Sequence, residues 1–242
     1  MLVLWSAHEL GDYTYFVQWR FRDDGCLMPQ VGLTGKLAHF GGDDKTGVDV
    51  GAERMALSHV HNIFFCLDLD VDGPRNVVEE FEFKPTSAAR DRAVTRWQPI
   101  TKECGRELDP HTFRSWRVVN PGSKNRLDQP RSYELVPGGT GIYRGMHPRN
   151  PKTSGAEPFA HFDVWVTRYH EREVPPARPL KESLPGFVNG ESVTNEDVVL
   201  WYMMSVHHQP RAEEWPAMPV DWHGFKLVPR DFLDKSPVAV GK

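Results

Sequence analysis

Alternation of apolar and polar side chains is the feature that most constrains the fold of this chain. Between Tyr13 and Phe21, aromatic or aliphatic side chains occupy every odd position, whereas positions 18 and 20 are Gln and Arg. A period of two is typical of a β-strand with one buried face. The sequence RDDG at 22–25 is a turn signal, and residues 27–33 can return as the second strand of a hairpin. This part of the chain is therefore predicted to be antiparallel β-structure.

Segments of the same kind recur along the chain. Further extended segments, rich in β-branched and aromatic residues, are predicted at 60–71, 76–83, 113–120, 131–138, 162–170 and 197–208. The chain has 20 prolines and 20 glycines, and the polar, Pro-rich segments 121–131 and 144–158 are interpreted as long loops. Only residues 87–94 favour a short helix. We therefore predict a mostly β fold, a large antiparallel β-sandwich, as a single domain over residues 1–242.

Composition excludes some classes of function. A net charge of −4 over 242 residues, with no dominant basic patch, gives no reason to expect a nucleic-acid partner. No run of about 18 apolar residues is present, so no membrane span is expected. The start MLVLWSAHEL lacks the basic region of a secretory signal, and a cytoplasmic location is the resulting expectation. Cys26, Cys66 and Cys104 show no CxxC spacing and are expected to be reduced thiols, with one disulfide as the alternative.

Two histidines one residue apart indicate a candidate metal site. His59 and His61 flank the start of the strand predicted from residue 60, and in a strand residues i and i+2 share a face with Cα atoms about 6.5–7 Å apart. Two histidines at this spacing arise more often by chance than as metal ligands. A third ligand from another part of the chain is therefore needed to support a metal site. His207 and His208, at the end of another strand, face opposite ways, and spacing does not choose between them. Three neutral imidazoles would suit copper or zinc.

A second ligand-like pattern follows in the same segment. Asp68, Asp70 and Asp72 alternate along the strand, with the opposite parity from the two histidines. Carboxylates at positions i and i+2 suit a hard cation such as calcium. A solvated acidic strand end before the turn at Gly73 explains the pattern equally well.

Several segments, in the same order, resemble the C-terminal part of the copper amine oxidases. Residues 10–25 (LGDYTYFVQWRFRDDG) are similar to that family's cofactor segment, and residues 59–73 (HVHNIFFCLDLDVDG) are similar to its two-histidine strand. Residues 195–220 resemble the region of the third copper ligand, and residues 224–238 resemble the family's tail. Shorter matches are 113–120, 133–137 and 164–169. The resemblance covers nearly all 242 residues and implies the family's β-sandwich catalytic domain.

The resemblance also implies a set of site residues. His59, His61 and His208 fall on the three copper ligands, and His207 precedes the last of them. Tyr13 falls on the tyrosine that copper and oxygen convert into the carbonyl cofactor topaquinone. The remaining matches are Tyr15, two residues after that tyrosine, Met218, near the copper, and a calcium site formed by Asp68, Asp70, Asp197 and the carbonyls of Leu69 and Val198.

The reaction that the resemblance implies is the oxidation of an amine. In the family, the quinone forms a Schiff base with a primary amine, and an aspartate removes the α-proton. The aldehyde then leaves, and oxygen reoxidises the cofactor with release of peroxide and ammonia. The resemblance therefore implies a copper-dependent oxidase that uses a small-molecule substrate and O2. It also implies a tight homodimer, which would cover an exposed sheet edge.

The cofactor motif departs from the family pattern at three positions. That pattern is Thr, two variable residues, Asn, the modified Tyr, Asp or Glu, then Tyr, whereas this chain has Glu9, Asp12 and Thr14 at the other fixed positions. Asp12 places a negative charge beside Tyr13, where a neutral amide is usual, and this charge should alter the pKa and the position of a quinone. Tyr13 is therefore expected either to become topaquinone or to remain an unmodified tyrosine beside the metal.

A further departure concerns the catalytic base. The family's proton-abstracting aspartate lies well upstream of the cofactor tyrosine, in a part that this chain lacks, and loss of a base typically costs about 10²–10⁴ in rate. Another carboxylate, a partner chain or a different reaction is expected instead. Two classes of function stay open: a copper-dependent oxidase, performing amine oxidation or another oxidative tailoring reaction, and a non-catalytic metal-binding subunit. The partner is a second copy or a second chain that supplies the N-terminal region.

Overall fold

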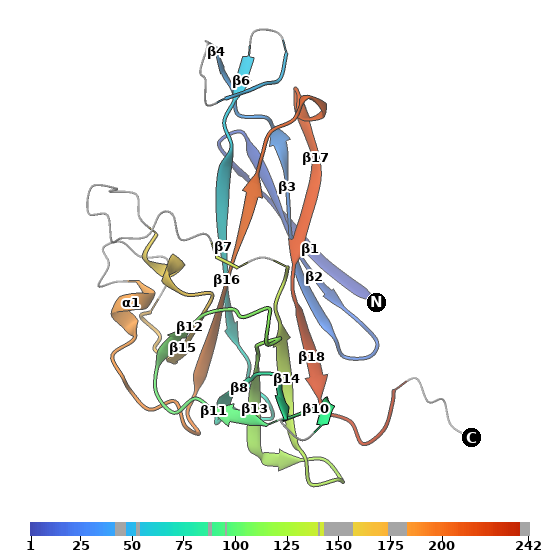
Figure 1. The fold of residues 1–242 in the computed structure, drawn as a ribbon, viewed down its shortest axis with the longest axis vertical. Coiled ribbons are helices and arrows are strands. Elements are labelled where there is room, and N and C mark those ends of the chain that lie inside the picture. Colours follow the sequence, from blue (N-terminus) through green and yellow to red (C-terminus); the bar gives the residue numbers. More distant parts are fainter. Residues whose placement is uncertain are drawn as a thin grey trace. The chain divides into compact units, whose positions relative to one another are not determined.

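The computed structural model describes residues 1–41, 47–51, 54–86, 89–94, 96–139, 141–142, 157–173 and 183–237. Within these ranges the chain is mostly β, as predicted, and its paired strands are antiparallel (Figure 1). The strands are β1 (Leu2–Leu10), β2 (Tyr13–Phe21), β3 (Leu27–Lys36), β4 (Phe40–Gly41), β5 (Val48–Asp49), β6 (Arg54–Ala56), β7 (His59–Asp68), β8 (Val77–Phe81), β9 (Lys84–Thr86), β10 (Ala89–Val94), β11 (Trp97–Pro99), β12 (Cys104–Arg106), β13 (Ser115–Lys124), β14 (Pro130–Val136), β15 (Val164–Arg168), β16 (Val198–His208), β17 (Ala217–Gly224) and β18 (Lys226–Arg230). The short helices are η1 (Pro158–His161), α1 (Leu184–Phe187) and η3 (Ala212–Glu214). No helix in the described ranges is long and apolar enough to cross a membrane.

The chain divides into two compact units. Unit 1 contains Met1–His61 and Ser205–Lys226, and unit 2 contains Asn62–Met204 and Leu227–Lys242. β7 and β16 therefore contribute to both units, because one end of each strand lies in unit 1 and the remainder lies in unit 2. The prediction of a single domain stays a prediction.

The sheet of unit 1 fixes the position of Tyr13. β1, β2 and β3 are adjacent in that order, and β17 also pairs with β3. The register places Gly35 of β3 opposite both Tyr13 of β2 and Met218 of β17. Gly35 has φ 116°, and a Cβ at this position would collide with the carbonyl oxygen of Asp12. Glycine therefore permits the close approach that joins β3 to the start of β2.

Apolar packing then buries the Tyr13 ring. Tyr13, Leu37, Val50, Ala56 and Met218 form a buried cluster in unit 1. Partly buried neighbours that pack against this cluster are Tyr15, Ala38 and Trp215. Because its ring belongs to this cluster, Tyr13 is held by packing as well as by strand pairing.

Unit 2 has its own core. One of its sheets has the strand order β18–β14–β13–β8–β11, and another has the order β12–β15–β16–β7. Side chains of β16 are buried from Val198 to Met204 on both faces, which explains the continuous apolar run in the sequence. The buried rings of Trp165 and Trp201 and the side chain of Met203 belong to one buried apolar cluster of this unit.

Most of the extended segments predicted from the sequence are strands in the structure. β2 has the predicted limits, and β7, β8, β13, β14, β15 and β16 overlap the predicted segments. β3 extends three residues beyond the predicted end, because Thr34 to Lys36 continue its pairing with β2 and β17. β1 and β17 were not predicted.

Two local predictions are wrong. The helix predicted at 87–94 is instead strand β10 over Ala89–Val94, which pairs with β9, and residues 87 and 88 lie outside the described ranges. A helix of this length is marginal by itself, so pairing with a neighbouring strand prevails. The loop predicted at 121–131 is a strand extension and a short turn, in which the Asn125 side chain accepts hydrogen bonds from the backbone N–H groups of Leu127 and Gln129. Of the loop predicted at 144–158, residues 144–156 lie outside the described ranges.

Candidate metal centre

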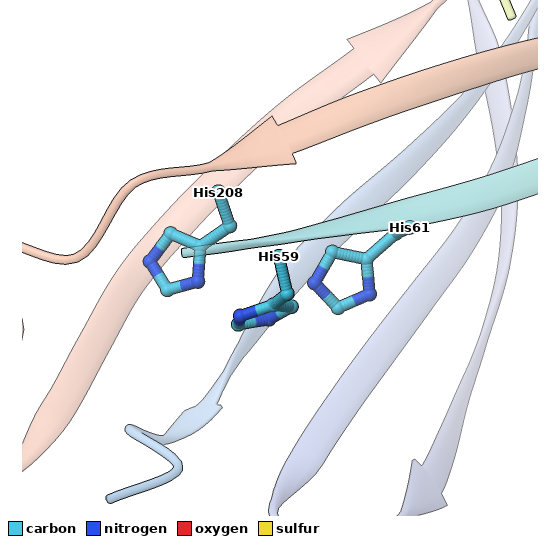
Figure 2. Close-up of side chains that lie close together, drawn as sticks. All are labelled: His59, His61 and His208. Carbon is cyan, nitrogen blue, oxygen red and sulfur yellow. The ribbon is translucent and has the colours of Figure 1, made fainter. Parts of the chain in front are cut away.

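Three histidines from two strands converge in unit 1. His59 and His61 lie near the start of β7 and project to one side, as the period of two requires, and His208 lies at the end of β16 (Figure 2). One ring nitrogen from each of the three residues lies within 4.8 Å of the others. All three side chains are partly buried. The two strands thus supply the three-imidazole cluster that the sequence only suggested.

Hydrogen bonds on the outer side orient two of the rings. Nδ1 of His59 lies 2.8 Å from the carbonyl oxygen of Leu57, which only accepts, so Nδ1–H donates and Nε2 carries the lone pair. Nε2 of His208 lies 2.8 Å from Oε2 of Glu214, so Nε2–H donates to the carboxylate and Nδ1 carries the lone pair. Both lone pairs face the centre of the cluster, where Tyr13 lies.

The Tyr13 hydroxyl reaches both of these nitrogens. Its oxygen lies 2.7 Å from Nε2 of His59 and 2.7 Å from Nδ1 of His208. A hydroxyl has one hydrogen, so it donates to only one of the two nitrogens and presents an oxygen lone pair to the other. One hydrogen therefore faces two acceptor nitrogens, and a cation bound among these atoms would satisfy the lone pair that is left without a donor. The observation therefore fits a metal site that includes the space beside the hydroxyl.

His61 completes the donor set. Its Nδ1 lies 2.9 Å from the hydroxyl of Tyr15, and its buried Nε2 has no hydrogen-bond partner among the described residues. Burial, reinforced by His59 and His208, lowers the pKa of His61 to about 4. The imidazole is therefore neutral near pH 7, which is the form that binds a metal. Neutral imidazole nitrogens are ligands suited to copper.

His207 lies outside the cluster. Its Nε2 lies 2.7 Å from Oγ of Ser58, and its side chain is exposed. Adjacent residues of β16 point to opposite sides, so only one of the two neighbouring histidines joins the cluster. The structure selects His208, a choice that spacing left open.

Comparison with known proteins assigns the family. Residues 1–240 match the family model described as copper amine oxidase, enzyme domain. The chain belongs to the copper amine oxidase family. The resemblance noted in the sequence is therefore confirmed.

Copper amine oxidases of several organisms are similar to this chain. A primary amine oxidase of Klebsiella aerogenes is 32% identical over 98% of this chain and 35% of its own length. The copper-containing amine oxidase gamma 1 of Arabidopsis thaliana is 29% identical over 98% of this chain and 37% of its own length. The crystal structure of a copper-containing benzylamine oxidase from Hansenula polymorpha matches with a TM-score of 0.87 and 27% identity, over 97% of this chain and 40% of that chain. The chain therefore spans well under half the length of these relatives.

Tyr13, which the sequence resemblance matches to the cofactor tyrosine, is shielded from solvent. Burial raises the pKa of its phenol, and Tyr15, Glu214 and Asp12 raise it further. Tyr13 and Met218 line a cavity of about 30 Å³ beside the histidines. Asp12, which the sequence resemblance matches to an amide of the family motif, is exposed in the turn before β2, and its carbonyl oxygen accepts a hydrogen bond from the backbone N–H of Lys36.

The acidic residues of the second pattern separate into two groups in unit 2. Carboxylate oxygens of Asp68, Asp70 and Asp197 lie within 4.8 Å of one another, and burial together with neighbouring carboxylates raises the pKa of Asp68 and of Asp197. Asp72 has φ 56° and instead accepts hydrogen bonds from the hydroxyl of Ser123 and from Arg131. The structure thus groups the same three carboxylates as the resemblance did.

The backbone positions of the implied calcium site have other partners as well. The carbonyl oxygen of Leu69 accepts a hydrogen bond of 2.9 Å from the backbone N–H of Val71. Val198 is buried at the start of β16, opposite Arg168.

The three cysteines are free thiols, as expected: Cys26 is buried, Cys66 exposed and Cys104 partly buried.

Sequence reasoning missed Glu214. Its carboxylate is buried against His208, but the sequence shows only two adjacent acids, Glu213 and Glu214, shortly after the histidine pair. No periodic pattern connects either acid with His208, because both acids lie in η3, which a turn separates from the end of β16. Only the folded chain distinguishes the buried acid from the exposed one.

Proposed function

We propose that this chain forms the copper-binding part of an oxidase that acts on a primary amine with O2 as the second substrate. The observation that carries this proposal is the convergence of three histidines beside Tyr13, whose hydroxyl lies 2.7 Å from a nitrogen of His59 and from a nitrogen of His208. Relatives named primary amine oxidase and benzylamine oxidase support the substrate class. The net reaction converts a primary amine, O2 and water into an aldehyde, ammonia and hydrogen peroxide.

The residues have distinct roles in this proposal. His59, His61 and His208 would hold copper, which when bound supplies the redox chemistry that activates O2. Tyr15 positions His61 through the hydrogen bond to Nδ1. Met218 and the surrounding apolar cluster keep bulk water from the Tyr13 ring, which packs edge-on against His61 with ring centres 4.7 Å apart.

Tyr13 is the proposed precursor of topaquinone. Its hydroxyl lies 2.7 Å from a nitrogen of His59 and from a nitrogen of His208, so its ring would be an oxidisable group next to the metal. The alternative is an unmodified Tyr13, with copper catalysing a different oxidative tailoring reaction or with the chain acting as a non-catalytic metal-binding subunit. Asp12 supports this alternative, because an acid replaces the usual amide beside the tyrosine.

Aerobic copper loading distinguishes these possibilities. Purified protein is loaded with one equivalent of copper in air, its visible spectrum is recorded, and phenylhydrazine is added. A pink colour and a phenylhydrazine adduct on the peptide that contains Tyr13 are expected, and the Tyr13→Phe variant should bind copper without either signal. Colourless copper protein that consumes O2 with a small-molecule substrate would support the tyrosine-retaining oxidase. Colourless copper protein without turnover would leave only the binding role.

Two further assignments accompany this function. We propose that Asp68, Asp70 and Asp197, with the carbonyls of Leu69 and Val198, hold calcium, because grouped carboxylates suit a hard cation. We also propose a homodimer, with a second chain as the alternative partner. The cytoplasmic location stays a prediction.

A further inference from the structure

Glu214 is a buried carboxylate that faces the outer nitrogen of a candidate copper ligand. It is 8% exposed, and its Oε2 lies 2.8 Å from Nε2 of His208. A buried carboxylate without donors is unfavourable, so its partners define what it does. The partners of Glu214 are His208 and Arg211.

The helix η3, and not His208, sets the position of this carboxylate. The backbone N–H of Arg211 donates to Oε2 of Glu214 at 3.2 Å, and Nε of Arg211 donates to Oε1 at 3.2 Å. The backbone N–H of Glu214 in turn donates to the carbonyl oxygen of Arg211 at 3.1 Å. The bond from the Arg211 N–H to the Glu214 carboxylate is one half of a capping box, and together these bonds tie the side chain to its own helical turn. Contacts within η3 and with Arg211 therefore hold the Glu214 carboxylate in place independently of His208.

We propose that Glu214 is a positioning residue that holds His208 in the tautomer protonated at Nε2, so that Nδ1 faces the metal position. A carboxylate accepts and does not donate, so it selects the ring nitrogen that carries the hydrogen. Partners of this kind, on the outer side of metal-binding histidines, fix the tautomer and the ring orientation. This inference rests on the proposed copper site.

The three outer partners of the cluster differ in a way that singles out Glu214. His59 is oriented by the carbonyl of Leu57, which no substitution removes. The partner of His61 is a hydroxyl, which both donates and accepts and so does not by itself select a tautomer. Glu214 is the one side chain of the three that enforces a single tautomer. The Arg211 contact does not explain its burial, because the Arg211 side chain is 65% exposed and such ion pairs contribute little.

The tautomer of His208 is measured first in the metal-free wild-type protein. Long-range ¹H–¹⁵N spectra of protein labelled at histidine identify the protonated ring nitrogen, and a His208→Gln sample assigns the signal. We expect His208 to be protonated at Nε2. Protonation at Nδ1 would overturn the proposal, and the tautomer itself is read in the wild-type protein.

Copper binding by three variants tests the consequence. In Glu214→Gln, the amide oxygen still accepts from Nε2–H, and the amide nitrogen faces the exposed Arg211 side chain, which can move away. Glu214→Met keeps the length of the side chain without an acceptor, and Glu213→Met is the matched control at the exposed neighbour. We expect copper affinity to fall about 10- to 100-fold in Glu214→Met and to stay within a few-fold of wild type in the other two.

Two results separate this role from a general structural one. The copper(II) EPR spectrum should change in Glu214→Met and remain that of wild type in Glu214→Gln. Equal loss of affinity in both Glu214 variants, or wild-type affinity in Glu214→Met, would overturn the proposal. Failure of the wild-type protein to bind copper would defeat the proposed function instead, whereas the tautomer of His208 is read without metal.

Discussion

At the scale of single residues, the directions of the hydrogen bonds indicate a metal site more strongly than the presence of three histidines does. The outer nitrogens of His59, His61 and His208 each have a partner, so the inner nitrogens face one another. The inner nitrogens of His59 and His208 both present lone pairs to the Tyr13 hydroxyl, whose single hydrogen serves only one of them. The metal-free cluster is therefore an arrangement that a cation stabilises.

The first prediction separates the histidines that contribute a nitrogen to the cluster from the one that does not. His59→Ala should abolish stoichiometric copper binding, because two imidazoles remain. His207→Ala should leave copper affinity within about 3-fold of wild type, because removing one exposed contact with Ser58 changes no ligand. Equilibrium dialysis with metal analysis checks both variants, and the reverse outcome would contradict the choice of His208.

The sequence predicts part of this site. The rest depends on contacts between distant parts of the chain, which a local pattern does not encode. The period of a strand places His59 and His61 on one face, and it shows that His207 and His208 point opposite ways. It does not show which side of β16 faces the cluster, because that depends on pairing with strands far away in the chain. The outer partner Glu214 has no periodic relation to His208 and could not be predicted.

At the scale of elements, the hairpin of β2 and β3 determines where Tyr13 lies. Gly35 faces Tyr13 across the pair, at a φ of 116° that other residues rarely adopt. β2, β7 and β16 were predicted because each has strong alternation or a long apolar run. β1 was missed because both of its faces are exposed, so burial imposes no pattern on its residues.

The second prediction concerns Gly35. Gly35→Ala should lower the free energy of unfolding by about 1–3 kcal/mol, because the methyl group is forced against the backbone of Asp12 and φ is strained. Urea unfolding followed by tryptophan fluorescence gives this value. Gly139→Ala is the control, because a Cβ there meets no described atom within 4 Å and φ is ordinary. Equal effects of the two substitutions would contradict the role of Gly35.

The third prediction concerns the carboxylates at the ends of β7 and β16. Calcium at 100 times its dissociation constant should stabilise the wild-type protein by about 2.7 kcal/mol, and Asp197→Asn should remove most of this effect. Thermal unfolding with calcium or with a chelator measures it, with the exposed Asp23→Asn as control. An unchanged calcium effect in Asp197→Asn would contradict the site.

In the absence of calcium, the pKa shifts of these carboxylates predict how the stability of the folded protein changes with pH. The pKa of Asp68 in the folded protein is raised by burial, Asp197 and Asp70, so the folded state binds this proton more tightly than the unfolded state does. The resulting stability is present below the ordinary aspartate pKa and is lost as the pH rises through the raised value. Without calcium, Asp197→Asn should therefore be more stable than wild type at pH 7, with the difference shrinking in acid.

At the scale of the whole molecule, the exposed strand β1 is the feature that bears on assembly. β1 lies at the edge of its sheet in the described part of the chain, and the side chains of Leu4 and Trp5 are 54% and 67% exposed. A long apolar edge strand is a template for pairing with another strand. This exposure supports the proposed homodimer.

The fourth prediction tests that proposal. The wild-type protein should elute with twice the 27.7 kDa chain mass in size-exclusion chromatography with light scattering. Leu4→Lys should shift the population toward the monomer, because a charged edge residue opposes strand pairing. Leu127→Lys, at an exposed turn position in unit 2, is the control. A wild-type monomer at all concentrations, or no response to Leu4→Lys, would contradict pairing through β1.

The position of the Tyr13 hydroxyl has a consequence for how the protein matures. Three imidazoles also bind zinc, although less tightly than copper(II), and zinc has no redox chemistry with which to alter a phenol. A zinc ion that arrived first would fill the same nitrogens and leave the ring intact. The order in which metals are delivered to the newly folded chain, and the rate at which copper displaces zinc, would then decide when a molecule becomes active.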